Sequence, residues 1–331
     1  MARLRVGTRG SALALAQSGQ VVAQLEQAGV PAELVVIRTS GDRLASISLA
    51  KVGGKGLFIK ELEEALAAHE IDLAIHSMKD VPAELPPGFV LAAVTTRADV
   101  RDVLVRRSTD APAGGVGAEA GTGTGGLSRL PALTALPRGA RVGTGSLRRR
   151  AQLAALRDDL DVRQMRGNVD TRLRKLEEGA YDAIVLAAAG LARLGIAPNA
   201  APLAADAFLP APGQGALAIE TCEDDVRVRE LLRVLDDRSS RAACAAERAF
   251  LRELGASCQV PVAAHARETA DGRLVLDGLV ASLDGSRVLR DVATGPTEHA
   301  EELGRRLADL LASRGAHELL RAAEEDTGTI D

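Results

Sequence analysis

One pattern occurs twice along this chain of 331 residues and constrains the fold more than any other feature. A strand, a Gly-Thr turn, a serine and the start of a helix follow one another at 5–12 and again at 141–147. A charged helical stretch followed by a short apolar strand recurs at 60–75 and at 174–185. Strands that alternate with helices predict a parallel α/β architecture. We therefore predict two lobes of similar topology that face each other across a cleft, although any two α/β units share part of this pattern.

The C-terminal third follows a different pattern. A chain of this length exceeds one ordinary core and predicts two or three domains. A strand at 216–220 is expected to return to the first lobe. Beyond it, two hairpin strands between 274 and 293 and a final helix at 298–314 predict a small α+β domain.

Residues 108–135 interrupt the α/β pattern. Seven of the thirteen residues from 114 to 126 are glycine, and the segment lacks apolar periodicity. Such a composition is typical of flexible chain. We expect a surface insertion in the second lobe that carries no chemistry.

Composition excludes several classes of protein. The net charge of −4 gives no whole-surface attraction to nucleic acid or anionic lipid. The longest apolar run, 183–192, is shorter than the about 20 residues of a membrane span, and residues 1–8 contain no apolar stretch of signal-peptide length. Three cysteines without Cys-x-x-Cys spacing argue against a disulfide framework and a zinc site. We expect a cytoplasmic protein with no metal and no membrane or nucleic-acid partner.

Two expected helix starts carry arginines where the helix dipole disfavours cations. The residues concerned are Arg148 and Arg149 after the expected cap Ser146, and Arg166 and Arg172 around the expected cap Asn168. An anion held between these arginines and the free backbone N–H groups would reverse the penalty. The alternative is a solvated basic surface.

Three further positions are candidates for chemistry. Lys79-Asp80 follows His76 at the end of an expected strand, where the lysine could steer an anion and the aspartate could stabilise a developing cation. The dipeptide could equally be a surface ion pair, and His76 is either a general base or a packed histidine. Cys258 lies in a turn, where a thiol is either a nucleophile favoured by nearby cations or inert. Cys244 fits helix packing.

Six motifs in order resemble the porphobilinogen deaminase family, and they cover nearly the whole chain apart from the glycine-rich insertion. They are Thr8-Arg9-Gly10-Ser11 with Leu13-Ala14-Leu15; KVGGKGLF at 51–58; HSMKDVP at 76–82; GSLRR at 145–149; Arg166-Gly167-Asn168 with Thr171-Arg172-Leu173; and CQVP at 258–261.

The resemblance implies a fold and a reaction. Two lobes related to periplasmic binding proteins flank an active-site cleft, and a third domain carries a cysteine on a loop. Four porphobilinogen molecules are joined head to tail with loss of four ammonia molecules, which gives the linear tetrapyrrole hydroxymethylbilane of haem biosynthesis. The product is built on a dipyrromethane cofactor held by a thioether, here on Cys258. The expected domains are 1–96 with 216–234, 97–215 and 236–331, in a monomer.

The resemblance also implies roles for single residues. Porphobilinogen bears an acetate and a propionate, and arginine pairs well with carboxylates. By the match, Asp80 with Lys79 is catalytic. The cofactor-binding residues are Lys79, Asp80, Ser146, Arg148 and Arg149; the substrate-binding residues are Arg9, Ser11, Arg149, Arg166 and Arg172; and the lid residues are Asp42, Lys55 and Phe58.

The chain departs from the family at two positions. Gly145 stands where the family often has a second serine, and Asp170 replaces a common glycine. Two rival interpretations remain. A two-lobed carboxylate or phosphate carrier gives no role to Cys258, and an arginine-rich nucleic-acid binder is disfavoured by the negative net charge and by an aromatic content of 2%.

Overall fold

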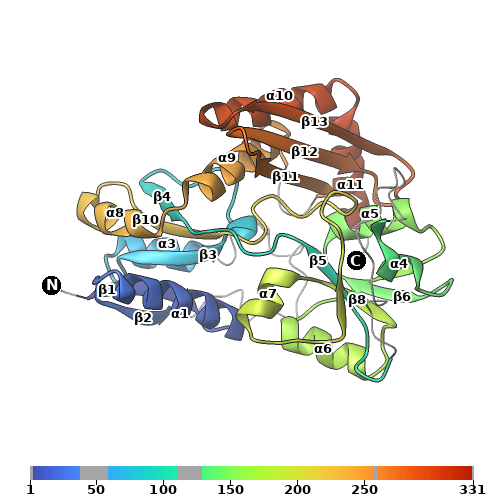
Figure 1. Ribbon diagram of the computed structural model, residues 1–331, viewed down its shortest axis with the longest axis horizontal. Helices are drawn as coiled ribbons and strands as arrows, with labels where there is room; N and C mark the ends of the chain where they lie inside the picture. The colour runs from blue at the N-terminus through green and yellow to red at the C-terminus, as the bar shows by residue number, and fades with distance from the viewer. Residues whose placement is uncertain (1–2, 38–58, 111–128, 257–259, 330–331) are drawn as a thin grey trace.

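The structure is a computed structural model that describes residues 3–37, 59–110, 129–256 and 260–329. Its strands form three sheets. Figure 1 shows the first group mainly in blue to cyan with the golden β10 and α8, the second mainly in green to yellow with the teal β5, and the third in orange to red. Two of the groups are α/β and the third is a small α+β unit, which confirms the predicted fold class.

The first sheet has the strand order β2-β1-β3-β10-β4. Its strands are β1 (Leu4–Arg9), β2 (Ala32–Ile37), β3 (Leu73–Ser77), β4 (Phe89–Val94) and β10 (Leu217–Cys222). The first three run parallel, and β10 is antiparallel to β3 and β4. The chain therefore returns to this sheet after it has formed the second one, as the sequence predicts for 216–220.

Helices cover both faces of the first sheet. They are α1 (Ala12–Gln27), α3 (Lys60–Ala67) and α8 (Val226–Leu232), the last followed by the 3-10 turn η4 (Arg233–Leu235). In α1, Val21 and Leu25 lie four residues apart and bury one stripe against Leu73 and Ile219 of the sheet. Leu62 of α3 lies in a separate cluster with Ala74 of β3.

The second sheet, with the order β7-β6-β8-β5-β9, repeats this arrangement. Its strands are β5 (Asp102–Val105), β6 (Arg141–Thr144), β7 (Asp161–Gln164), β8 (Ala183–Ala187) and β9 (Ala200–Pro202). Three parallel strands are again followed by an antiparallel fourth strand, β5. The helices are α4 (Pro131–Thr134), α5 (Leu147–Leu156), α6 (Val169–Glu177) and α7 (Ala188–Arg193). The two lobes thus share one topology, which confirms that prediction.

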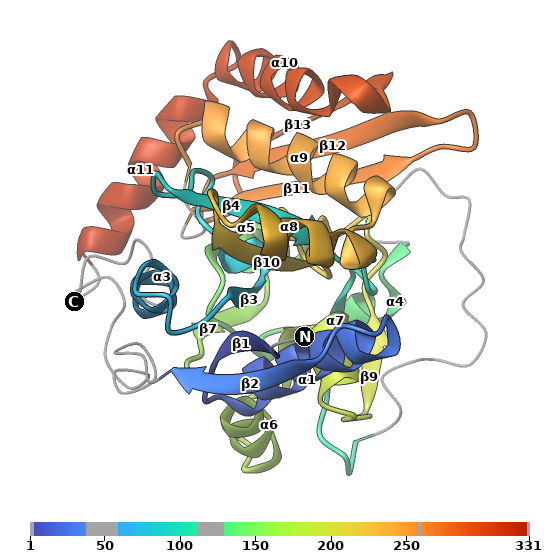
Figure 2. The ribbon, with the colours of Figure 1, turned by 90° about the vertical axis from the view of Figure 1, so that its left-hand side faces the viewer.

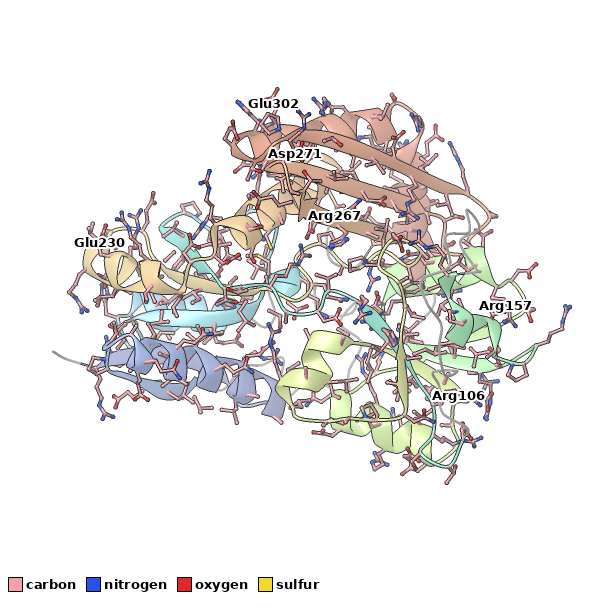
Figure 3. The ribbon with its side chains drawn as sticks, in the orientation of Figure 1. Arg106, Arg157, Glu230, Arg267, Asp271 and Glu302 are labelled. Atoms are coloured by element: carbon pink, nitrogen blue, oxygen red, sulfur yellow. The ribbon has the colours of Figure 1, made fainter. Side chains whose placement is uncertain are left out.

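The prediction of a flexible surface segment is wrong for the C-terminal end of 108–135. Leu130 and Leu133 are fully buried in the core of the second lobe, and α4 lies between 131 and 134. Arg157, labelled in Figure 3, holds this turn by donating to the carbonyl oxygens of Leu133 at 2.9 Å and Leu136 at 3.2 Å. The apolar residues at three-residue spacing explain the ordered packing. The glycine-rich residues themselves lie outside the described residues.

The third sheet contains β11 (Val262–Glu268), β12 (Arg273–Ala281) and β13 (Val288–Pro296), which are all antiparallel. Its helices are α9 (Arg238–Glu253), α10 (Ala300–Ala312) after the 3-10 turn η5 (Thr297–His299), and α11 (Ala316–Thr329). The hairpin is confirmed, but β11 and α11 were not predicted. The expected final helix at 298–314 is in fact shorter, because its first two residues belong to η5 and α10 ends at Ala312. Gly315, with a φ of 97°, then separates α10 from α11.

The third group of elements lies over the other two (Figure 2). Its outer face carries exposed charges such as Glu302, and Glu230 projects from the first lobe in the same way (Figure 3). Within the described ranges, no helix is long and apolar enough to cross a membrane.

Candidate functional site

Five of the predicted site residues lie at or just after the carboxyl ends of parallel strands, where ligands bind in open α/β sheets. Arg9 ends β1 and Ser11 follows it; Lys79 and Asp80 lie in a 3-10 turn, η2 (Met78–Asp80), directly after β3. In the second lobe, Ser146 follows β6. The internal repeat therefore places equivalent loops of both lobes at equivalent ends of their sheets.

Serines cap α1 in the first lobe and α5 in the second. Ser11 Oγ accepts from the N–H of Ala14 at 3.3 Å, and Ser146 Oγ accepts from the N–H of Arg149 at 3.4 Å. Asn168 occupies the N-cap position of α6, but its side chain makes no capping hydrogen bond. The predicted N-cap is therefore confirmed at Ser146. Asn168 takes the predicted N-cap position, but not the expected capping hydrogen bond.

The two arginines after Ser146 are buried around one carboxylate. Arg149 donates to Asp102 Oδ1 from Nη2 at 2.7 Å and from Nε at 3.2 Å, and Arg148 Nη1 donates to Asp102 Oδ2 at 2.8 Å. Asp102 is completely buried, and the arginines are 4% and 6% exposed. A solvated basic surface is excluded for these two residues. The sequence predicts an anion beside these arginines, and the carboxylate of Asp102 supplies part of that negative charge from within the chain.

Asp102 does not satisfy the whole cluster. Its own pKa is held far below the usual range by Arg148 and Arg149, although burial opposes that shift. Burial and the charge of Arg149 lower the pKa of Arg148, and Asp102 offsets part of that effect. Arg148 Nε is also buried, with no hydrogen-bond partner among the residues that the structure describes. Two guanidinium groups therefore share a single carboxylate.

Lys79 of the first lobe joins this cluster. The residue as a whole is half-buried, and its ammonium donates to Gln214 Oε1 at 3.3 Å. Burial lowers its pKa to about 8; Arg148 and Arg149 act in the same direction, whereas Asp80 and Asp102 raise it. Asp80 itself is exposed. The lysine is thus close enough to the second lobe to sense its charges.

Arg172 extends the group of cations. Its Nε donates to the carbonyl oxygen of Gly167 at 2.7 Å, and burial together with the charge of Arg149 lowers its pKa. Its Nη2 also lies 3.7 Å from the position that a Cβ on Gly145 would take, and that Cβ would crowd the carbonyl oxygen of Met165. The glycine at 145 therefore fits the close approach of two backbone segments. Arg166 is exposed.

Two of the remaining candidate residues are buried in the protein core, and the other four lie outside the residues that the structure describes. His76 is 6% exposed, and its Nε2 lies 2.8 Å from Oε2 of the buried Glu220, so it is a packed histidine. Cys244 is buried in α9, where burial raises its pKa to about 12, as expected for helix packing. The candidates Asp42, Lys55, Phe58 and Cys258 lie outside the described residues.

Sequence reasoning missed Asp102, Gln214 and Arg193. Asp102 opens the short strand β5, and Gln214 stands in the sequence Pro-Gly-Gln-Gly, so neither has a local pattern that marks it. Arg193 of α7 donates to the carbonyl oxygen of Gly215 at 2.6 Å and lines a cavity of about 200 Å³ between the lobes, together with Gln20 of α1 and Thr95. Of the predicted site residues that the structure describes, none lines that cavity.

The residues present fit the cofactor that the resemblance implies. A dipyrromethane made from two porphobilinogen units carries four carboxylates. In the cluster, the cations Lys79, Arg148, Arg149 and Arg172 outnumber the carboxylates Asp80 and Asp102. The unpaired Arg148 Nε and the lowered pKa of Arg172 both indicate that an acidic ligand would stabilise this arrangement. In the described parts of the chain, no three His, Cys, Asp or Glu residues gather as metal ligands.

Known proteins match the chain over nearly its whole length. Residues 4–230 match the family described as "Porphobilinogen deaminase, dipyromethane cofactor binding domain", and residues 241–313 match "Porphobilinogen deaminase, C-terminal domain". The porphobilinogen deaminase of Syntrophobacter fumaroxidans is 48% identical over 96% of both chains. That of Syntrophotalea carbinolica is 49% identical over 97% of this chain and 96% of its own.

Similarity to solved structures is weaker. The periplasmic aliphatic sulphonate binding protein SsuA from Escherichia coli is 11% identical and covers 97% of this chain and 91% of its own, with a TM-score of 0.40. The sequence matches decide the assignment, since two domain families and full-length relatives agree. The chain belongs to the porphobilinogen deaminase family.

Proposed function

We propose that this protein is a hydroxymethylbilane synthase, a transferase that joins four porphobilinogen molecules head to tail and releases ammonia. The observation that carries the proposal is the buried group of cations around Asp102, on a chain that matches porphobilinogen deaminases from end to end. A substrate with two carboxylates per unit is the chemistry that such a group recognises.

The dipyrromethane cofactor is held by a thioether to Cys258 and by Lys79, Ser146, Arg148 and Arg149. When bound, it supplies the pyrrole carbon to which substrate units are added. The described residues on either side of Cys258 support this placement, because the N–H of Ala256 donates to the carbonyl oxygen of Leu251 in α9 at 3.1 Å and β11 begins at Val262. The N–H of Ala264 in β11 also donates to the carbonyl oxygen of Pro210, so this part of the third unit lies beside the segment that carries Gln214.

Asp80 is the catalytic carboxylate. It is exposed at the end of β3, beside the ammonium of Lys79. Positive charge develops on a pyrrole when ammonia departs and when a new bond forms, and a fixed carboxylate stabilises that charge. The same oxygen atoms can accept and return a proton in these steps. Lys79, Arg9, Ser11, Arg149, Arg166 and Arg172 bind the acidic side chains.

The domain boundaries fall at the two connections between the lobes. We assign 1–96 with 216–234 to the first domain, 97–215 to the second and 236–331 to the third. The position of β10 in the first sheet supports this division, as does the β12–β13 hairpin in the third. Two connections allow hinged lobes to make room for a lengthening chain. The lid role of Asp42, Lys55 and Phe58, the monomeric state and the cytoplasmic location remain predictions from the sequence.

The proposed anion role of Arg172 is tested by Arg172→Ala with Arg174→Ala as its control. Both residues lie on α6, but Arg174 is exposed and pairs with Glu178. We expect Arg172→Ala to leave enzyme carrying incomplete chains, seen as extra species by intact mass, because a growing chain adds two carboxylates per unit. Arg174→Ala should turn over like the unmodified enzyme. Equal behaviour of the two variants would contradict the proposed binding role.

A further inference from the structure

Gln214 occupies an unusual place between the lobes. It lies in the second connection, just before β10, and is 1% exposed. Its Oε1 accepts from Lys79 Nζ at 3.3 Å. Its Nε2 donates to Asp102 Oδ1 at 2.9 Å and to the carbonyl oxygen of Val100 at 2.7 Å. One amide therefore contacts a cation of the first lobe and the central carboxylate of the second.

The amide is oriented by its partners. Asp102 Oδ1 and the carbonyl of Val100 can only accept hydrogen bonds, and the ammonium of Lys79 can only donate. The side-chain oxygen must therefore face the lysine and the nitrogen must face the second lobe. Replacement by a carboxylate or by an apolar group would break this pattern on at least one side.

The backbone around Gln214 is held as well. Its carbonyl oxygen accepts from Arg97 Nε at 2.8 Å, which ties the second connection to the first. Gly213, with a φ of 75°, packs on η2 so closely that a Cβ there would lie 3.1 Å from the backbone nitrogen of Lys79. The backbone from which the Gln214 side chain extends is therefore fixed in position next to η2, the turn that carries Lys79.

We propose that Gln214 is a positioning residue, which fixes the distance between the Lys79 ammonium and the Asp102–Arg148–Arg149 cluster so that cations from both lobes face one acidic ligand. The inference rests on the role proposed above for Lys79. Without the amide, the ammonium loses an acceptor while it still faces the charges of Arg148 and Arg149. Asp102 in turn loses one of the donors that hold it between the two arginines.

The first test uses protein without the cofactor. In Cys258→Ser protein, the pKa of Lys79 is read from the pH dependence of its acylation by acetic anhydride, with Lys60 and Lys175 as internal references on the same peptide map. We expect Gln214→Met to lower that pKa by about one unit, because a hydrogen bond to a charged group is worth at least that much. Asp80, Asp102, Arg148 and Arg149 are the other charged groups that face Lys79 and are unchanged.

Gln152→Met is the matched control. Gln152 is also a buried glutamine, 3% exposed. Its amide bonds to the backbone of Leu209 and, at 3.5 Å, donates to the carbonyl oxygen of Arg148, with no hydrogen bond to Lys79 or Asp102 in the described structure. It should lose similar stability in thermal unfolding and leave the acylation profile of Lys79 unchanged. An unchanged profile in Gln214→Met, or the same shift in Gln152→Met, would overturn the proposal.

A second test separates this inference from the proposed function. In the cofactor-bearing enzyme, Gln214→Met should lower kcat/KM for porphobilinogen by about 10- to 100-fold, the scale expected for a small misplacement. Added to Lys79→Met, it should cause little further loss. If Gln214→Met lowered kcat/KM as much in the Lys79→Met protein as it does alone, its effect would not act through Lys79, and the inference would be overturned. If Lys79→Met alone turned over substrate like the wild type, the proposed role of Lys79 would be refuted. The acylation test would still decide whether Gln214 positions the Lys79 ammonium.

Discussion

Asp102 shows how single residues shape this site. Burying two arginines and an aspartate removes three charges from water, and the pairing only partly offsets that cost. Such an arrangement is a weak source of stability, but it holds guanidinium groups at one geometry. Arg149 uses Nε, Nη1 and Nη2 to contact Asp102 and the carbonyl oxygen of Val185, which a lysine could not do. The cluster therefore provides a fixed surface for carboxylates.

Asp80 is expected to be essential for turnover and dispensable for folding. Asp80→Asn removes the charge that stabilises a cationic pyrrole, and we expect kcat to fall by about 10²- to 10⁴-fold. The midpoint of thermal unfolding should stay unchanged, because the side chain is exposed. Glu84→Gln, at an exposed acidic position four residues further on, is the control for charge loss alone. Full activity of Asp80→Asn would refute the assigned role.

Lys79 predicts a pH dependence of binding. Its pKa is lowered to about 8 by burial, so the ammonium is charged below that pH and loses its proton as the pH rises through it. The unfolded chain keeps this proton to a higher pH, so this group's contribution makes the folded state relatively more stable above pH 8. Carboxylates of the bound cofactor raise this pKa, so in the cofactor-bearing enzyme we expect KM for porphobilinogen to rise at a pH above 8. Lys79→Arg should keep a flat KM there, and parallel profiles of the two proteins would contradict the account.

The sequence predicts some site residues and hides others for a physical reason. Arg148 and Arg149 are visible because they violate a local rule of helix charge. Asp102 lies 46 and 47 residues from them, and Gln214 lies 135 residues from Lys79. Their roles exist only after the two connections between the lobes are folded, and no local spacing reports such contacts.

At the scale of elements, the β12–β13 turn presses on the helix that carries the arginines. A Cβ on Gly285 would overlap the backbone of Ala154 and Ala155 in α5, whereas one on Gly272 would meet nothing within 4 Å. Both glycines have positive φ, 72° and 74°. Gly272→Ala should therefore cost only about 1–2 kcal/mol of strain, and Gly285→Ala about 1–3 kcal/mol more, from overpacking.

Because the added Cβ in Gly285→Ala would push on α5, the variant should also affect substrate binding by the arginines of that helix. We expect a raised KM for porphobilinogen in that variant and an unchanged KM in Gly272→Ala. Denaturant unfolding and steady-state kinetics on both proteins check this prediction. Equal unfolding midpoints together with equal KM values would show that the turn does not support α5.

Helices and strands are predicted from the sequence more accurately when the repeating pattern of apolar residues is long. Alternating strands and helices identify both α/β lobes, because each repeat spans a strand and a long helix. The strands β5 and β9 have four and three residues, which is too short for any periodicity to show. The last helix predicted from the sequence ends at 314, and α11 is not predicted, although Leu319, Leu320 and Ala323 are buried there.

At the scale of the molecule, Glu247 of α9 joins the three units. Its carboxylate accepts from Arg97 of the first connection at 2.7 and 2.9 Å, from the N–H of Gly213 in the second connection, and from Ala266 of β11. Glu247 is fully buried, and the side chain of Arg97 is only 10% exposed. Glu247→Gln leaves a buried cation without its counter-charge, and we expect a loss of about 3–5 kcal/mol in the free energy of unfolding.

The exposed pair Arg101–Asp99 is the comparison for that variant. It also joins a guanidinium to both carboxylate oxygens, but its side chains are 45% and 37% exposed. Asp99→Asn should cost less than about 1 kcal/mol. Urea unfolding of both variants measures the difference, and a loss for Glu247→Gln no larger than that for Asp99→Asn would show that the junction does not hold the units together.

The central claim is that an acidic dipyrrole is covalently attached to this chain and lies among its cations. Intact mass spectrometry of freshly purified active enzyme and of Cys258→Ser tests it directly. The account predicts that the unmodified protein exceeds its sequence mass by two porphobilinogen units less two molecules of ammonia, and that Cys258→Ser shows no excess. Active enzyme at the bare sequence mass, or an adduct that persists in Cys258→Ser, would contradict it.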